Sequence, residues 1–395
     1  MIRHLLKLVW NRKRANALIA VEIFFSFLVV FAVLTALVTF VGGWREPLGF
    51  EWQNVLNVSM QIEASSREKA PKELHERVMA MIAEAEAMPE VEAAAMAMTP
   101  PYTFSTASNS RSWRNREVSY LFDEVTDGYF EAMQLKLLRG RWFSREDDAA
   151  PEQPVVLDAP AARLFFGDEN PVGQKIEGEG EVLKVVGVVA AFRKDGETSA
   201  PSSTMFRRYA PNAAYGRIGS DLVIRVRPGT PAAFEQKLAA RLQQIAPDIP
   251  LSIRPMEQLR NRMSRMRLAP LVVASIVGLF LIAMVALGLI GVLWQTVTRR
   301  TREIGLRRAL GASGSGVRRQ VLGEVALLAT IALTLGVVIV LQLPILGVFS
   351  LVTPSAFTTG LVAAVAAIYL LTVLCGLYPS WLASRLEPAD ALRYE

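Results

Sequence analysis

Four long stretches of this chain contain almost no charged residue, and they constrain the fold more than any other feature. No charge occurs between Glu324 and Arg385, a stretch of 60 positions, whereas a helix needs only about 20 apolar residues to cross a bilayer. That stretch therefore has room for two spans. Residues 268–298 carry no charge either, and residues 15–44 carry only Glu22. The sequence predicts four transmembrane helices.

The first apolar stretch follows a basic tail, as the apolar part of a signal peptide does. The run 17–41 is longer than the roughly 7–15 apolar residues of a signal peptide, and no small-x-small cleavage pattern follows it before Gly42. We therefore expect a retained anchor. Glu22 lies in its first turns. A carboxylate near the interface pairs with a cation such as Arg12 or Arg14, whereas one at mid-membrane is usually functional.

Basic residues predict the orientation, because short loops rich in Lys and Arg remain in the cytoplasm. Both tails, the loop between the second and third spans and the cytoplasmic ends of the adjoining spans hold 14 Lys and Arg against 6 Asp and Glu, a net charge of +8. Since the whole chain carries +6, the segment 44–267 carries −2. We expect both termini in the cytoplasm and this segment outside. Four arginines lie just outside the second span, but long translocated segments are largely exempt from the charge rule; they are Arg260, Arg262, Arg265 and Arg267.

The external segment has the periodicities of a large α+β domain. Residues 52–100 and 220–256 each contain a strand, a helix and a strand, and together they predict a split α+β part that resembles a porter domain. The β-rich stretch 112–203 is interpreted as an inserted subdomain. Residues 257–268 predict a helical stalk that runs into the second span. The predicted boundaries are a cytoplasmic amphipathic tail at 1–16, spans at 17–43, 268–297, 321–346 and 356–378, the external domain at 44–267, a cytoplasmic loop at 298–320 and a cytoplasmic C-terminus at 379–395.

Several classes of function are excluded because the sequence lacks the residues that they require. His4 and His75 are the two histidines, and the predicted topology places them on opposite sides of the membrane, which excludes a Ser-His-Asp triad and a histidine metal site. The segment 311–316 has the GxxxxG spacing of a phosphate loop, but Val317 and Arg318 replace its Lys and its Ser or Thr. We expect no catalytic residue, metal or cofactor in this chain. Nucleic acid is excluded as a partner, because its binding needs a basic face on a folded domain.

Three groups of motifs resemble the MacB/FtsX permease superfamily. The first is Arg-Arg-Thr-Arg-Glu-Ile-Gly-Leu-Arg-Arg-Ala-Leu-Gly-Ala-Ser at 299–313, with Gln320, Leu322 and Glu324 after it. The second is the C-terminal end, 378–383 and 385–393. The third resembles a MacB-like periplasmic core domain and comprises 125–130, 138–143, 162–167, 170–174 and 185–189. Together these segments cover most of the chain.

The resemblance implies an integral membrane α-helical permease of the bacterial inner membrane. It implies two permease chains, identical or related, that dock cytoplasmic ABC ATPase subunits binding ATP and Mg. Membrane lipid surrounds the spans, and an adaptor or a substrate protein in the periplasm is a further partner. Because the chain begins a few residues before its first span, it resembles the stand-alone permease arrangement. The function implied is export or extrusion driven by motion of the external domain. The alternatives are an FtsX-like signalling subunit that activates an extracytoplasmic enzyme without transport, and an enzyme anchored in the membrane.

The loop at 298–320 has two interpretations. As a topological anchor it needs only positive charge. As an ATPase-coupling element, which the resemblance implies, it needs a specific helical face and a tight turn. Glu303 and Arg307 are four residues apart and can pair on one helical face, and Gly311 allows a turn with positive φ. The residues expected to couple the permease to its ATPase are Arg302, Glu303, Gly305, Arg307, Arg308, Gly311 and Ala312.

Overall fold

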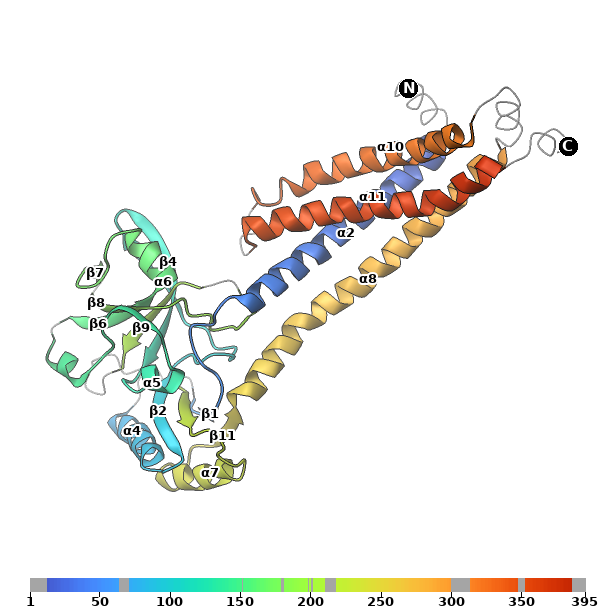
Figure 1. Cartoon of the computed structure of the whole chain (residues 1–395). Helices are drawn as coiled ribbons and strands as arrows, with labels where there is room; N and C mark the ends of the chain where they lie inside the picture. The colour runs from blue at the N-terminus through green and yellow to red at the C-terminus, as the bar shows by residue number, and fades with distance from the viewer. Residues whose placement is uncertain are drawn as a thin grey trace. The chain divides into compact units, whose positions relative to one another are not determined.

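The computed structural model describes residues 13–63, 71–150, 152–178, 181–197, 199, 202–209, 218–299, 313–346 and 352–385. The chain divides into two compact units, each described by itself (Figure 1). One unit comprises residues 1–42 and 268–395 and contains the apolar helices. The other, residues 43–267, is the αβ domain inserted between the first and second of them.

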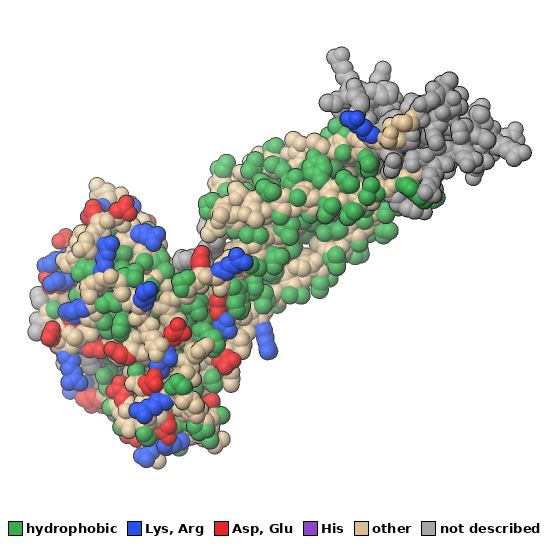
Figure 2. Space-filling view, viewed as in Figure 1, with side chains coloured by type: hydrophobic (Ala, Val, Ile, Leu, Met, Phe, Trp, Pro, Cys, Tyr) green, Lys and Arg blue, Asp and Glu red, His purple; other side chains and the backbone are tan. Residues whose placement is uncertain are grey.

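The helical unit is built from α2 (Lys13–Arg45), α8 (Met256–Arg299), α10 (Gly314–Val340) and α11 (Pro354–Arg385). In the described ranges, four helices are long and apolar enough to cross a membrane, which confirms the four predicted spans. Phe27 and Phe31 of α2 are buried together with Leu289, Leu333 and other residues from the other three helices. The outward surface is mainly hydrophobic in Figure 2, as lipid contact requires.

The helix bounds differ from the expected spans at two places. Helix α8 already begins at Met256, so the stretch 257–268 expected as a stalk belongs to the same helix as the second span. Helix α10 begins at Gly314, inside the stretch 298–320 expected as a loop. Ser313 caps it, since its hydroxyl accepts a hydrogen bond from the backbone N–H of Gly316 at 3.2 Å.

The αβ domain contains one sheet of 11 strands in the order β11-β1-β10-β2-β4-β9-β6-β8-β5, with β3 paired to β4 and β7 to β8. Most neighbours are antiparallel, whereas β4–β9 and β6–β8 are parallel. The strands are β1 (Val55–Met60), β2 (Val91–Ala97), β3 (Ser108–Trp113), β4 (Arg116–Val125), β5 (Leu137–Gly140), β6 (Gln153–Asp158), β7 (Lys175–Gly178), β8 (Glu181–Val189), β9 (Thr204–Arg208), β10 (Asp221–Val226) and β11 (Leu251–Pro255).

Two strand-helix-strand units together form one half of the domain. They lie where the periodicities of the sequence predict them. They are β1-α4-β2 and β10-α7-β11, with α4 at Lys72–Glu86 and α7 at Phe234–Ile245. Val78 and Met81 of α4 and Leu238 of α7 are completely buried against the apolar side of the sheet, which includes Val58 and Leu222. Alternation along β1 directs Asn57 and its polar neighbours to the opposite face.

The stretch 112–203, expected as an inserted subdomain, does not form a sheet of its own. Its strands continue the same sheet, and β2 and β4 share the single backbone pair Ala97–Val125. Helix α6 (Ala159–Phe166) covers this half, and Phe165 and Leu157 are fully buried there. Sequence patterns show which residues form strands, but they do not show which distant strands pair, so the common sheet was not predicted.

A third cluster of buried residues covers the face of the sheet opposite α4 and α7. It includes Val223 of β10, Tyr129 and Met133 of α5 (Tyr129–Met133), and Met256 and Met263 from the first turns of α8. The beginning of α8 is therefore part of the core of the domain.

Candidate functional site

The seven residues expected to couple the permease to an ATPase lie at 302–312, outside the described residues. The structure begins again at Ser313, the N-cap of α10. The coupling role of Arg302, Glu303 and Gly311 therefore stays a prediction. The described residues instead define a second site, in the αβ domain, where the chain enters from α2 and leaves through α8.

The loop 193–197 after β8 carries the charged groups of this site, which we name the arginine junction: Arg193, Asp195, Glu197, Arg260 and Arg267. Arg193 is only 2% exposed. Its guanidinium donates to the carbonyl oxygen of Gly43 at 2.7 Å and to that of Glu197 at 3.1 Å. The Glu46 carboxylate lies 3.6 Å from it. Arg193 thus fixes the loop to the last turn of α2 and to Glu46, which follows it.

Gly43 is needed for this approach. A Cβ atom at this position would lie 2.0 Å from the carbonyl oxygen of Glu197, which is a backbone atom and cannot rotate away. Only a residue without a side chain lets the two segments come so close.

Arg260 and Arg267 attach α8 to the same loop. The Nε and Nη2 atoms of Arg260 both lie 2.7 Å from Glu197 Oε1. The guanidinium carbon lies 5.1 Å from the ring centre of Trp44 and 4.6 Å from that of Trp52, so it makes cation–π contacts with both. Arg267 pairs with Asp195 at 2.8 Å. Charge-assisted hydrogen bonds of this kind are stronger than neutral ones. The junction therefore holds the end of α2 and the beginning of α8 against the loop 193–197.

Burial shifts the pKa values of three titratable groups near the junction. Burial, followed by the nearby Glu197 carboxylate, raises the pKa of Tyr102. Burial lowers the pKa of Lys194, whose ammonium donates to the carbonyl oxygen of Ser105. Burial also raises the pKa of Asp123 to about 7, although the N–H groups of Met98 and Thr99 donate to its Oδ1 at 3.0 and 2.9 Å. The Lys194 contact attaches the loop 98–107 to the loop 193–197, and the Asp123 contacts attach it to β4.

Glu22 of the first helix is placed against the second. A Cβ atom on Gly288 of α8 would lie 2.7 Å from the Glu22 carboxylate, so the glycine leaves the space that this carboxylate occupies. Glu22 is half-buried in the helical unit. The pairing of Glu22 with Arg12 or Arg14 stays a prediction, because Arg12 and the Arg14 side chain lie outside the described part of the chain.

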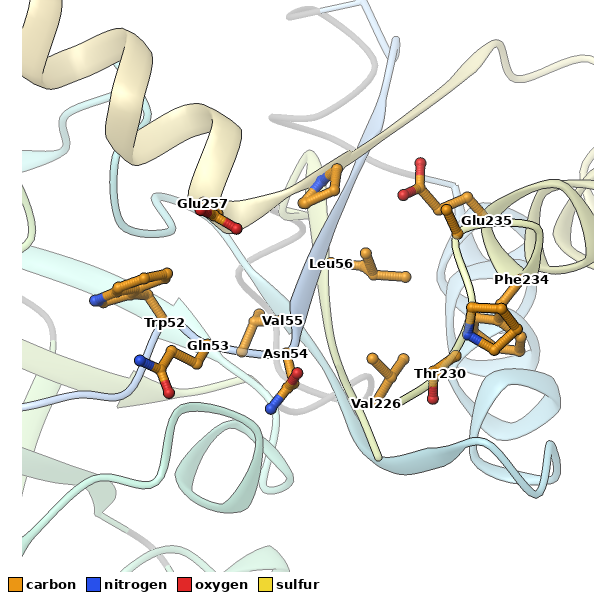
Figure 3. Close-up of a pocket in the computed structure, with 13 residues that line it drawn as sticks. Trp52, Gln53, Asn54, Val55, Leu56, Val226, Thr230, Phe234, Glu235 and Glu257 are labelled. Carbon is orange, nitrogen blue, oxygen red and sulfur yellow. The ribbon is translucent and has the colours of Figure 1, made fainter. Parts of the chain in front are cut away.

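A cavity of about 430 Å³ opens beside the junction, where β1 begins and β11 ends (Figure 3). Leu56 and Val226 form an apolar floor, Trp52 lies at one side, and the carboxylates of Glu235 and Glu257 lie toward the rim. None of the described cations forms an ion pair with either carboxylate. In the described ranges, no group of three His, Cys, Asp or Glu residues is placed to hold a metal ion.

Sequence reasoning noticed only half of the junction. Arg260 and Arg267 stood out because they carry positive charge on the predicted outer side of the membrane. Their partners lie about 60–70 positions earlier, in the charged run Arg-Lys-Asp-Gly-Glu at 193–197. That run follows a buried strand, and this was the available signal. Nothing in the sequence indicates that the run pairs with α8.

The four apolar helices and the αβ domain between the first two define a multi-pass membrane protein. Residues 23–241 match the MacB-like periplasmic core domain, and residues 275–388 match the FtsX-like permease C-terminal family. The chain therefore belongs to the MacB/FtsX-type family of ABC transporter permeases, which are multi-pass proteins of the bacterial inner membrane.

Curated relatives agree with this family. The chain is 31% identical over 291 residues to the macrolide export ATP-binding/permease protein MacB of Chromobacterium violaceum, a match that covers 72% of this chain and 45% of the relative. It is 30% identical over 314 residues to the protein of the same name from Burkholderia cenocepacia, with coverage of 76% and 46%. The chain spans about half the length of the curated relatives it matches.

Among solved structures, the periplasmic region of MacB from Actinobacillus actinomycetemcomitans is similar with a TM-score of 0.40 and 15% identity. The match covers 56% of this chain and 98% of that one.

Proposed function

We propose that this chain is the transmembrane subunit of an ABC transporter, which couples ATP hydrolysis in a separate subunit to motion of its external domain. The motion serves export or extrusion of a substrate from the periplasm or the membrane. The observation that carries the proposal is the extent of α8. This helix begins at Met256 in the core of the αβ domain and ends at Arg299, next to the residues expected to contact the ATPase.

In this mechanism α8 is the moving part. Closure of the ATPase subunits displaces the loop 298–320 and with it the end of α8. A helix transmits displacement along its axis because most of its backbone hydrogen bonds lie within it, and in α8 the ring of Pro270 removes one of them between Arg267 and the apolar part of the helix. At the other end, Arg260 and Arg267 carry the displacement to the loop 193–197, and Arg193 carries it to the last turn of α2. The arginine junction keeps the end of α2 and the beginning of α8 together during this movement.

The proposal includes the partners. Two permease chains, identical or related, face two ATPase subunits, which bind ATP and Mg. Both termini lie in the cytoplasm and residues 44–267 lie outside, where a periplasmic adaptor or substrate protein meets the external domain. The spans contact membrane lipid.

Two substitutions test the coupling role of the loop. Glu303→Lys makes the loop more positive, and Gly311→Val leaves its charge unchanged, so an anchor tolerates both. A coupling element tolerates neither, because the first reverses an ion pair and the second puts a β-branched residue into a tight turn. We expect both variants to insert normally. Co-purification with the ATPase should fall at least about tenfold, or about 1.4 kcal/mol, and the permease-dependent ATP hydrolysis should be lost.

The matched control is Arg300→Lys, which preserves the charge next to the same segment. It should retain wild-type co-purification and wild-type stimulation of ATP hydrolysis. If Glu303→Lys and Gly311→Val also gave wild-type values, the loop would be an anchor only.

A further inference from the structure

A second cavity lies in the αβ domain, on the polar face of the sheet where β1 meets β10 and β11. Its volume is about 280 Å³. The first turns of α8 form one wall and the loop 102–105 forms another. All of its lining residues belong to residues 43–267, so the cavity is formed within one unit.

The floor of this cavity is unusually polar for an interior strand. Strand β1 lies between β11 and β10, and its alternate residues Asn57, Ser59 and Gln61 line the cavity. The register places Arg254 of β11 opposite Asn57, and places Ser59 between Ser252 of β11 and Asp221 of β10. A polar strand face normally lies in water. Asn57 is nevertheless only 4% exposed, whereas Ser59 is half-buried and Gln61, just after β1, is exposed, so the face is enclosed at Asn57 and open toward Gln61.

One polar atom in the floor lacks a partner. The Nδ2 atom of Asn57 donates to Asp221 Oδ1 at 2.8 Å, which fixes the orientation of the amide, and Ser220 donates to Asp221 Oδ2 at 2.7 Å. Asn57 Oδ1 is buried and accepts no hydrogen bond from the described residues. A buried acceptor left in this state costs about 1–3 kcal/mol. This atom has almost no accessible surface, so it marks a polar interior beneath the cavity and is not itself a contact atom for a ligand.

The walls supply positive charge. Arg254 and Arg262 both line the cavity and are exposed. Within the described part of the chain, neither has a carboxylate within ion-pair distance, unlike Arg260 and Arg267. The Asp221 carboxylate already accepts from Asn57 and Ser220. Two guanidinium groups therefore remain for an anion, and planar guanidinium groups suit carboxylate and phosphate.

An aromatic ring completes the walls. Phe104 is 60% exposed, although it lines the cavity, and the Arg262 guanidinium lies 6.0 Å from its ring centre. An exposed ring of this kind offers an apolar surface beside the charged groups. The cavity is close to the lower limit of about 300 Å³ for small-molecule sites, so its size suits a single ring rather than a polymer segment.

We propose that this cavity binds a sugar that carries an anionic group. The hydroxyl and amide groups of Ser59 and Gln61 contact the ring hydroxyls, and Arg254 and Arg262 bind the carboxylate or phosphate. The C–H face of the sugar packs on Phe104. This site is independent of the proposed transport function, because binding by the chain alone requires no ATPase.

The test is titration calorimetry on the full chain in detergent, with four compounds. Glucuronate and glucose 6-phosphate carry the hydroxyls with a carboxylate or a phosphate, glucose carries the hydroxyls alone, and inorganic phosphate carries the charge alone. At least one acidic sugar should bind saturably, and glucose and phosphate should each bind at least tenfold more weakly. The stronger acidic sugar identifies which anion the site accepts.

Variants locate the site. Arg254→Gln and Arg262→Gln should each weaken binding of that acidic sugar at least fivefold, because each removes a charge-assisted hydrogen bond. Arg265→Gln is the matched control, since it removes an exposed arginine of α8 that does not line the cavity, and its affinity should equal that of the wild type. The proposal is overturned if neither acidic sugar binds, if phosphate alone binds as tightly, or if Arg265→Gln weakens binding as much as the other two.

Discussion

Arginines gather at both ends of the second apolar helix, one group in the αβ domain and the other in the stretch that follows the helix. The domain-side arginines are Arg260, Arg262, Arg265 and Arg267. The loop arginines are Arg299, Arg300, Arg302, Arg307, Arg308, Arg318 and Arg319, with Glu303 as the one acidic residue between Arg299 and Arg319. In the first group, Arg260 pairs with Glu197 and Arg267 with Asp195, residues of a loop that lies far away in sequence.

This comparison shows what a count of charges leaves out. Positive residues that flank a span act as a topological signal through their charge. Where a folded domain supplies carboxylates, as at the arginine junction, part of that charge is neutralised by the tertiary structure. Arg260 and Arg267 therefore serve the fold, whereas the loop arginines have no comparable supply of acidic residues in the sequence around them.

The largest expected effect concerns orientation, because its outcome is all or none. With Cys375 removed, a single cysteine at Ser108 should react with a membrane-impermeant maleimide in intact cells. A cysteine at Ser313 should react only after the cells are opened. The reason is the charge of +8 on the segments predicted inside. Labelling of the Ser313 variant in intact cells would reverse the roles assigned to the two groups of arginines.

A smaller effect is expected from loss of the most buried member of the junction. Arg193→Ala leaves the carbonyl groups of Gly43 and Glu197 without their donor and removes the counter-ion of Glu46. A buried carbonyl group left without its donor costs about 1–3 kcal/mol, and the Glu46 carboxylate adds little because its side chain is 56% exposed. We expect the free energy of unfolding of the full chain to fall by that amount in a denaturant titration followed by tryptophan fluorescence.

The control for Arg193→Ala is Arg265→Ala, which removes an exposed domain-side arginine. Surface substitutions of this kind usually change stability by less than about 0.5 kcal/mol. Equal losses for the two variants would mean that the junction does not distinguish paired arginines from unpaired ones.

The smallest expected effect is the coupling energy of a single contact, the one between Arg260 and Glu197. A double-mutant cycle with Arg260→Gln and Glu197→Gln should give a coupling energy of about 0.5–3 kcal/mol, since the two side chains touch and are largely buried. The same cycle on Arg265 and Glu197 should give a value near zero. The unfolding free energies of the four variants measure both couplings. A coupling energy near zero for Arg260 and Glu197 would mean that their contact contributes no more to stability than an exposed ion pair does.

Much of the fold could be predicted from the sequence, because the relevant signals are local. Charge-free stretches indicate the four helices, and period-two and period-3.6 patterns indicate β1, α4, β10 and α7. The joining of all strands into one sheet could not be predicted. It depends on the pair Ala97–Val125 and on other contacts between strands that are distant in the chain.

The site was predicted less well than the fold. The coupling residues came from a resemblance and lie outside the described residues. The arginine junction needs Gly43, Arg193 and Arg260 together, and those residues become neighbours only in three dimensions. The polar alternation of β1 was visible as a strand pattern. Its enclosure by α8 and the loop 102–105, which makes a cavity of it, was not.

The strand order also determines when the domain can fold during synthesis. Strand β1 pairs with β10 and β11, and Asn57 and its partner Asp221 are 164 positions apart. Ribosomes add about 5–20 residues per second, so β1 remains without either neighbour for roughly 8–33 s after its own synthesis. During that time its backbone N–H and C=O groups are available to other unpaired strands. A cell that makes this protein must therefore protect the first strand until the last strand has been made.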